Sequence, residues 1–271
     1  MNPQVFHPDF CLSEYVQCYW DLQGDLGSTP RKNTIVSDGT IKLIFHYGDT
    51  YINHREDGQQ VLLPKFFLVG QLTKPFVVEP IGITGSFVVR FHPNGFLPFS
   101  TIPIKDMENE VVTLDRLFGA KGIELGEKIL NSITTTERIS FIEEFLVEQL
   151  SDRAALDFVV KSAIQTIQFK KGNFKISEFS RHLNIDRRQL GRKFSSNVGL
   201  SPKQLSKTIR IQTVLKTLLS QNIDSLTDLA YQNDYFDQAH FIKEFKEFTG
   251  LTPKKFYGEN LKMSLIFDTI T

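Results

Sequence analysis

The first part of the chain alternates short apolar runs with turn residues. Runs rich in β-branched and aromatic residues cover positions 40–49, 66–72, 75–83 and 84–93, and Gly, Pro, Asp and Asn separate them. Short strands of this composition at close spacing are typical of an all-β barrel or sandwich. The pattern therefore predicts a β-rich, barrel-like domain over residues 1–115.

Beyond residue 115 the apolar positions follow the helical period instead. Ile139, Ile142, Leu146 and Leu150 recur three or four residues apart, and a second series of this kind runs over residues 154–169. These helices are expected to pack on the first domain, on each other or on a second subunit. The polar, Gly-containing segment 170–175 predicts a boundary. Residues 116–169 then form a helical linker or dimerisation region, and residues 170–271 form an all-helical domain.

The C-terminal part contains an internal repeat. The stretch VGLSPKQL (198–205) returns as TGLTPKKF (249–256), 51 positions later. Upstream, Phe194 matches Phe245 at the same offset, and Phe179 matches Leu229 at an offset of 50. The difference of one residue falls between two predicted helices, where an insertion is tolerated. Each copy thus predicts a short helix, a tight turn and a longer helix, which is the layout of a helix-turn-helix.

The repeated stretch also carries the signals that end one helix and start the next. Gly199 and Gly250 can take the left-handed conformation that ends a helix. Ser201 and Thr252 suit the N-cap of the next helix, and a proline follows each of them at the first helical position, where a missing N–H costs nothing. Apolar residues then continue at helical spacing as far as Leu219, which predicts one long helix joining the two units.

The longer helix of each unit has one apolar and one polar face. The apolar positions on a wheel of about 100° per residue are Leu190 and Phe194 in the first helix (about 187–197), and Phe241, Phe245 and Phe248 in the second (about 237–249). The opposite faces hold Arg188 and Arg192 in the first helix, and Ala239, Lys243 and Lys246 in the second. An arginine on such a face can donate two hydrogen bonds to O6 and N7 of guanine. The faces therefore predict two recognition helices for the DNA major groove.

A net charge of zero hides an uneven distribution. Residues 1–160 hold 13 Lys/Arg and 21 Asp/Glu, a net charge of −8, whereas residues 161–271 hold 18 and 10, a net charge of +8. Such an asymmetry indicates that one half meets a polyanion. Double-stranded DNA fits this part of the chain, although an ordinary solvated basic surface would have the same composition.

These features together resemble a known family. Residues from about 165 to 258 are similar to the DNA-binding domain of the AraC/XylS transcription regulators, most of all over Ala230–Phe256, where Ala, an aromatic residue, Phe-x-Lys-x-Phe-Lys and Gly-x-Thr-Pro follow in the family's order. Asp234 stands where the family usually has Gly, and Asp tolerates the left-handed region better than most residues. The resemblance implies two helix-turn-helix units that enter successive major grooves about 34 Å apart.

The resemblance also implies which residues meet DNA. The positions that face bases in the family are Arg188, Gly191 and Arg192 in the first helix, and Gln238, Ala239, His240 and Lys243 in the second. Arg187 and Lys193 are expected to contact phosphates, and Lys246 belongs to the exposed cationic face. Gly191 has no side chain, so its expected use is a close approach of the backbone to DNA. Each of these cations could also be an ordinary exposed helix charge, and His240 fits base contact and plain surface equally well.

The N-terminal half resembles, more weakly, a β-rich domain that is fused to AraC-type regulators. The matching stretches are SDGTIKLIFHYGD, VGQLTKPF and GSFVVRFHPNGF. In that family such domains sense a small molecule or dimerise. The partners implied are double-stranded DNA, a small-molecule effector, a second copy of the chain and, for an activator, RNA polymerase. No cofactor is implied.

The main alternative is a small-molecule-binding or metal-dependent barrel with an accessory DNA-binding domain. His46, His54 and Glu56 are close in sequence and His92 follows a predicted strand, but their spacing is not that of a metal-ligand motif. No P-loop or Gly-x-Ser-x-Gly pattern occurs, so no enzymatic activity is expected. A third alternative is an architectural protein that binds DNA without sequence preference.

The chain has no signal for export or membrane insertion. No run approaches the roughly 20 apolar residues that span a bilayer, and the N-terminus lacks the basic and apolar regions of a signal peptide. The expected location is the cytoplasm, where Cys11 and Cys18 stay reduced. The sequence as a whole predicts an α+β protein with a β-rich N-terminal domain followed by helices, and an all-α C-terminal domain that regulates transcription by binding specific DNA.

Overall fold

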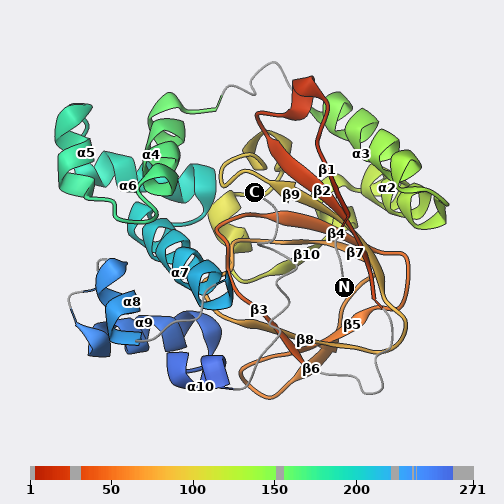
Figure 1. The fold of residues 1–271 in the computed structure, drawn as a ribbon. Helices are drawn as coiled ribbons and strands as arrows, with labels where there is room; N and C mark the ends of the chain where they lie inside the picture. The colour runs from red at the N-terminus through yellow and green to blue at the C-terminus, as the bar shows by residue number, and fades with distance from the viewer. Residues whose placement is uncertain are drawn as a thin grey trace.

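The chain folds into a β-rich N-terminal half and a helical C-terminal half (Figure 1). The computed structural model describes residues 4–24, 32–150, 156–220, 226–233, 235 and 237–258. Within these residues the predicted α+β class is confirmed, with strands first and two helical units last.

The strands form two antiparallel sheets. They are β1 (Gln4–Phe6), β2 (Val16–Gln23), β3 (Asn33–Ile35), β4 (Lys42–His46), β5 (Tyr51–His54), β6 (Gln60–Leu62), β7 (Phe66–Val69), β8 (Phe76–Pro80), β9 (Gly85–Phe91) and β10 (Val111–Thr113). One sheet has the order β1-β2-β9-β4-β7-β10, and the other has the order β3-β8-β5-β6. Among the described strands the sheets do not join into a closed barrel, so the barrel-like domain is an open two-sheet sandwich.

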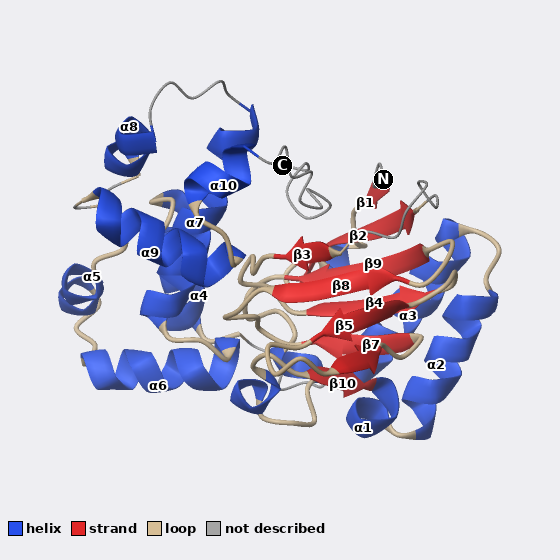
Figure 2. Cartoon of the chain, turned by 90° about the horizontal axis from the view of Figure 1, so that it is seen from below, coloured by secondary structure: helices blue, strands red, loops and turns tan. Residues whose placement is uncertain are grey.

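The central strands of the larger sheet are buried on both faces, because every residue of β4 and β9 is buried, including the charged side chains of Lys42 and Arg90. Trp20, Phe67 and Val88 fill the layer between the two sheets. On the opposite face, Phe45 and Phe87 pack in one core with three helices. Those helices are α1 (Leu114–Phe118), α2 (Ala120–Asn131) and α3 (Thr135–Gln149), and α2 lies on the far side of the sheets from the C-terminal helices (Figure 2).

The C-terminal half contains the two predicted helical units. Its helices are α4 (Phe158–Phe169), α5 (Ile176–His182), α6 (Arg187–Val198), α7 (Pro202–Ser220), α8 (Leu226–Gln232), α9 (Gln238–Thr249) and α10 (Pro253–Gly258). Helix α7 runs between the units, with α5 and α6 at one end and α8–α10 at the other (Figure 1). This arrangement confirms two helix-turn-helix units joined by one long helix.

Helix α4 belongs by its packing to the first of these units. It buries Val160, Ala163 and Ile167 in one core with side chains of α6 and α7, so residues 116–169 are not a single packing unit. The helix expected over 154–169 begins only at Phe158, because the carboxylate of Asp157 caps it by accepting hydrogen bonds from the amides of the second and third helical residues. Residues 151–155 lie outside the described part of the chain.

The N-terminal half contacts both units. The loop before β4 places Val36 in the core formed by α7 and the second unit. The short 3-10 helix η3 (Ile104–Met107) packs against α6, and a β-carbon added to Gly199 would lie 3.0 Å from a methyl group of Ile104. At the surface, Lys161 of α4 pairs with Glu14. The sandwich is therefore packed directly on the elements that carry the candidate site.

Candidate nucleic-acid interface

Helices α6 and α9 are built in the same way. Asp186 caps α6 by accepting hydrogen bonds from the amides of Arg188, at 2.8 Å, and Gln189, at 3.2 Å. Asp237 caps α9 by accepting one from the amide of His240, at 2.7 Å. Each helix has 12 residues and ends at a glycine in the left-handed region, as the repeat predicts, with φ of 80° at Gly199 and 76° at Gly250. Only glycine takes this conformation without steric cost.

The apolar faces of both helices are buried as predicted. Leu190 and Phe194 of α6 are fully buried, and they pack with α4 and with the start of α7. Phe241, Phe245 and Phe248 of α9 are buried against α7, α8 and α10. Burial of one face fixes which residues remain on the other.

The polar face of α6 is open to solvent. Arg187, Arg188 and Arg192 are exposed, and no ion pair to them occurs within the described residues. Gly191 is half-buried, and among the described residues no atom beyond its neighbours and the backbone of α6 lies within 4 Å of the position that a β-carbon would take there. The structure therefore brings three free guanidinium groups together with an open stretch of backbone.

The polar face of α9 has a different composition. Gln238, Ala239, His240, Lys243 and Lys246 are all exposed. The imidazole of His240 lies 3.8 Å from a carboxylate oxygen of Glu244 and packs beside the ring of Tyr235. The apolar side chain of Ile242 is also partly exposed, at 36%, and sequence reasoning did not place it on this face. Helix α9 thus presents an amide, a small apolar group, an imidazole and two ammonium groups.

Lys193 is the one predicted contact that points elsewhere. Its ammonium group pairs with the carboxylate of Asp157 at the start of α4, and the side chain of Lys193 is only 32% exposed. Burial by itself would raise the pKa of Asp157, but the hydrogen bond from Lys193 and the two amides of α4 outweigh it and lower that pKa. Lys193 is therefore already neutralised inside the protein.

Sequence reasoning missed a buried carboxylate on α9. The side chain of Glu244 is 2% exposed, and Oε1 accepts hydrogen bonds from Arg210 of α7 and from the hydroxyl of Tyr235. A usable signal was its position, because residue 244 lies three residues after Phe241 and four before Phe248, on the inner face of the helix. Asp234, expected in the turn before α9, lies outside the described residues.

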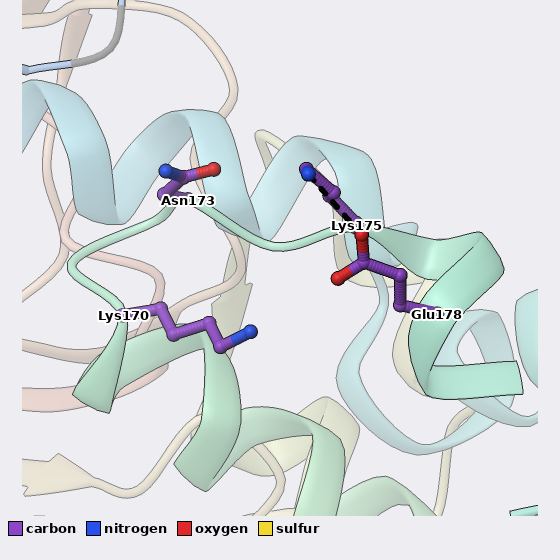
Figure 3. A pocket seen from close by; sticks show the side chains of 4 residues that line it. All are labelled: Lys170, Asn173, Lys175 and Glu178. Atoms are coloured by element: carbon purple, nitrogen blue, oxygen red, sulfur yellow. Dashed lines mark ion pairs between the residues drawn. The ribbon is translucent and has the colours of Figure 1, made fainter. Parts of the chain in front are cut away.

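A small open hollow lies at the start of the first unit (Figure 3). Lys170, Asn173, Lys175 and Glu178 line it, and Lys175 pairs with Glu178 at 3.1 Å. The lining is polar and is contributed by the segment between α4 and α5 and by α5 itself. This segment adds exposed lysines to the unit that contains α6.

The residues considered for a metal site do not converge. His46 shares a hydrogen bond with Ser86, His54 pairs with Glu79, and Glu56 pairs with Lys74. The imidazole of His92 contacts the carbonyl of Ser13 instead. In the part of the chain that the structure describes, no cluster of three or more His, Cys, Asp or Glu residues has a geometry suited to a metal ion.

The two cysteines are free thiols, with Cys11 exposed and Cys18 buried. None of the described helices has both the length and the apolar character needed to cross a bilayer.

Comparisons with known proteins match the two halves separately. A helix-turn-helix domain family matches residues 179–258, and a domain of unknown function (DUF6597) matches residues 4–113. An HTH-type transcriptional regulator of Staphylococcus aureus is 31% identical over 87 residues, which are 32% of this chain and 12% of the relative. The virulence regulon transcriptional activator VirF of Shigella flexneri is 26% identical over 153 residues, 56% of this chain and 57% of VirF. The chain thus spans only part of the length of these relatives.

The solved structures that are similar include wild-type ToxT from Vibrio cholerae with a bound unsaturated fatty acid. The two share 13% identity, with a TM-score of 0.46 over 88% of this chain and 93% of ToxT. The assignment rests instead on the matched helix-turn-helix domain and on the paired units that the structure shows. Residues 179–258 are thus a helix-turn-helix domain, and its two units are similar to the DNA-binding domain of AraC-type transcription regulators.

Proposed function

We propose that this protein binds specific double-stranded DNA and regulates transcription, with α6 and α9 reading successive major grooves. The observation that carries the proposal is the shared construction of the two helices. Each buries an apolar face, is capped by an aspartate and exposes polar side chains on the opposite face. Such a helix fits the major groove, and two of them on one rigid connector match two grooves about 34 Å apart.

Arg188 and Arg192 are the proposed base readers of α6, because each can donate two hydrogen bonds to guanine. Gly191 lies between them and allows the backbone to approach the DNA closely. Arg187, at the first position of the helix, is the proposed phosphate contact. Lys193 is held by Asp157 and does not belong to this set.

Helix α9 presents other chemistry to the second groove. Gln238 suits adenine, the methyl group of Ala239 suits the methyl group of thymine, and Lys243 suits guanine. His240 is the fourth proposed reader, and Lys246 is a proposed phosphate contact. The two helices have the same caps and buried faces but different residues at the positions proposed to contact bases. The two halves of the DNA site are therefore expected to differ in sequence.

The N-terminal sandwich is the proposed regulatory part. It packs on α6 through η3 and on α7 through the loop that contains Val36, so a change in the sandwich can reach both recognition helices. In this proposal the domain responds to a small-molecule effector or brings two copies of the chain together. An activator would also contact RNA polymerase, and the site of action is the cytoplasm.

The test is selection of bound sequences from random double-stranded DNA with the purified full-length chain. We expect an enriched site with two dissimilar halves, and an affinity that falls steeply as the salt concentration rises. Equal binding of all sequences would replace this proposal with the architectural alternative. Absence of salt-dependent binding, combined with stoichiometric metal in the purified protein, would favour the metal-dependent barrel.

A further inference from the structure

The same position in the two recognition helices holds an ion-paired charge of opposite sign. Lys193 and Glu244 are 51 positions apart, the offset that also aligns Phe194 with Phe245. Both side chains turn toward the protein, whereas the residues just before them, Arg192 and Lys243, are exposed. The repeat therefore places an internal charge next to a proposed base reader in each unit.

Glu244 ties α9 to the helix that joins the units. Its Oε1 atom accepts hydrogen bonds from Nη2 and Nε of Arg210, at 2.8 and 3.2 Å, and from the hydroxyl of Tyr235 at 2.8 Å. The ammonium group of Lys207, also on α7, lies 3.7 Å from Oε2. The guanidinium of Arg210 packs over the ring of Tyr235, 4.7 Å from its centre. The buried carboxylate thus contacts Arg210, Lys207 and Tyr235, and the exposed imidazole of His240 lies 3.8 Å from its Oε2 atom.

Lys193 ties α6 to a different element. Its partner, Asp157, is the cap of α4 and lies 36 positions earlier in the chain. This pair is less buried than the first, with side chains 32% and 24% exposed. The first recognition helix is therefore anchored to the connection that comes from the N-terminal half, and the second is anchored to α7.

Apolar packing decides which face of each helix is buried, but it restrains small rotations less than a directional contact does. Contacts between aromatic rings and aliphatic side chains are not directional, whereas a hydrogen-bonded ion pair has a preferred geometry. Adjacent residues on a helix point about 100° apart, so fixing Lys193 fixes the direction of Arg192. Fixing Glu244 does the same for Lys243. A small rotation would take a reader out of reach of its base, because paired hydrogen bonds to a base edge need defined angles.

On the basis of the proposed DNA binding, we propose that Lys193 and Glu244 are positioning residues. They do not touch DNA. Each sets the rotation of its recognition helix, and each acts on the half-site that this helix reads. The two copies of the repeat thus use the same helix position for an internal ion pair, but the charge at that position and its partner differ between the copies.

The test measures base preference at each half-site for the full-length chain with Lys193→Met or Glu244→Met. Methionine matches the length of glutamate, is one atom shorter than lysine, and removes the charge of either. We expect Glu244→Met to reduce discrimination about 10-fold at the half-site read by α9 and to leave the other half-site unchanged. Lys193→Met is expected to do the reverse. Glu127→Gln and Lys171→Met change matched charges at exposed positions away from the two ion pairs and are expected to preserve both preferences.

Two further measurements separate positioning from other roles. A phosphate contact at Lys193 would make the salt dependence shallower by about one unit for Lys193→Met while base preference stays intact, and this result would overturn the proposal for Lys193. Glu244→Gln keeps an acceptor for Arg210 and Tyr235, so it should retain most of the preference that Glu244→Met loses. A variant that simply unfolds would lose affinity for both half-sites equally, and such a uniform loss would count against positioning.

Sequence selection by the wild-type protein tests the proposed function separately from the positioning role. If the wild-type chain selects no sequence, the proposed sequence-specific DNA binding is wrong. If it selects a site with two halves and the Met variants select the same site, then the function stands and the positioning role is rejected.

Discussion

The side-chain amide of Gln212 donates a hydrogen bond of 2.5 Å to the carbonyl oxygen of Ser37. This bond joins the middle of α7 to the loop before β4, across the boundary between the two halves. Val36, next to Ser37, lies in the apolar core of the second helical unit. The loop is therefore shared between the sandwich and the helix that sets the spacing of α6 and α9.

Loss of the Gln212 bond should weaken this attachment. Gln212→Leu leaves the carbonyl of Ser37 without its donor in a buried contact, and the expected decrease in the free energy of unfolding is about 1 kcal/mol. Urea denaturation measures it, with Gln168→Leu at an exposed position of α4 as the control. Equal midpoints for the two variants would show that the bond contributes nothing.

The same loop contains the carboxylate of Asp38, which lies between two cations. Lys42 and Arg90 stand opposite each other on β4 and β9, and Asp38 contacts them at 2.7 and 3.0 Å. Asp38→Asn would remove the carboxylate charge that Asp38 supplies to these two buried cations, so we expect it to lower the free energy of unfolding by about 3–5 kcal/mol. Asp106→Asn, at an exposed position, should change it little. If the two variants were equally stable, the cluster would not hold the loop.

Acid should remove the Asp38 contribution only at very low pH. Burial by itself would raise the pKa of Asp38, but Lys42 and Arg90 outweigh it and lower the pKa from 3.8 to about 2. The stabilisation is therefore fully present above pH 3.8 and is lost as the pH falls through about 2.

His46 should make the protein less stable in mild acid. Burial, with a smaller effect of the Lys65 charge, lowers the pKa of His46 from 6.5 to about 3. Between these values the unfolded chain binds a proton at His46 and the folded chain does not, so the free energy of unfolding falls by up to about 1.4 kcal/mol per pH unit as the pH decreases. For His46→Gln, the free energy of unfolding measured by denaturation over this pH range should depend less on pH, because the His46 contribution is absent. His7→Gln, at an exposed position, should keep the wild-type slope; identical slopes for all three proteins would contradict the assignment to His46.

Arg192 tests the proposed base contact directly. We expect Arg192→Ala to reduce the preference for one base pair by about 1–3 kcal/mol, because two hydrogen bonds to a guanine are lost. Binding to selected and to point-mutated sites measures this difference. An equal loss of affinity on selected and random DNA would show that Arg192 contacts the backbone instead.

Gly191→Ala should change the stability of the protein and its DNA affinity in opposite directions. Outside its own turns of α6, no atom of the described residues lies within 4 Å of an added β-carbon, and alanine favours a helix interior over glycine by about 1 kcal/mol. Gly191→Ala is therefore expected to stabilise the protein. In the proposed complex the same methyl group meets DNA, so affinity for the selected site should fall. A variant that is more stable and binds equally well would exclude close approach of the backbone at Gly191.

The sequence by itself determined the features that depend on neighbouring residues. Glycine at 199 and 250 ends each recognition helix, and the capping box of Ser201 and Gln204 starts α7, with hydrogen bonds of 2.8 and 3.2 Å. The buried faces of α6 and α9 follow from the helical period. All of these arise from interactions within one or two turns of the chain. The repeat in the sequence shows the glycine ends and the buried faces twice.

Only the tertiary structure decided which charges face inward. Lys193 and Arg192 look alike in sequence, but Lys193 pairs with an aspartate 36 positions away and Arg192 remains exposed. Glu244 became an anchor because α7 places Arg210 against it, and α4 joined the first unit because its apolar face fits α6 and α7. Such contacts join segments that are distant in sequence, and their energies depend on burial and geometry that exist only after the chain has folded.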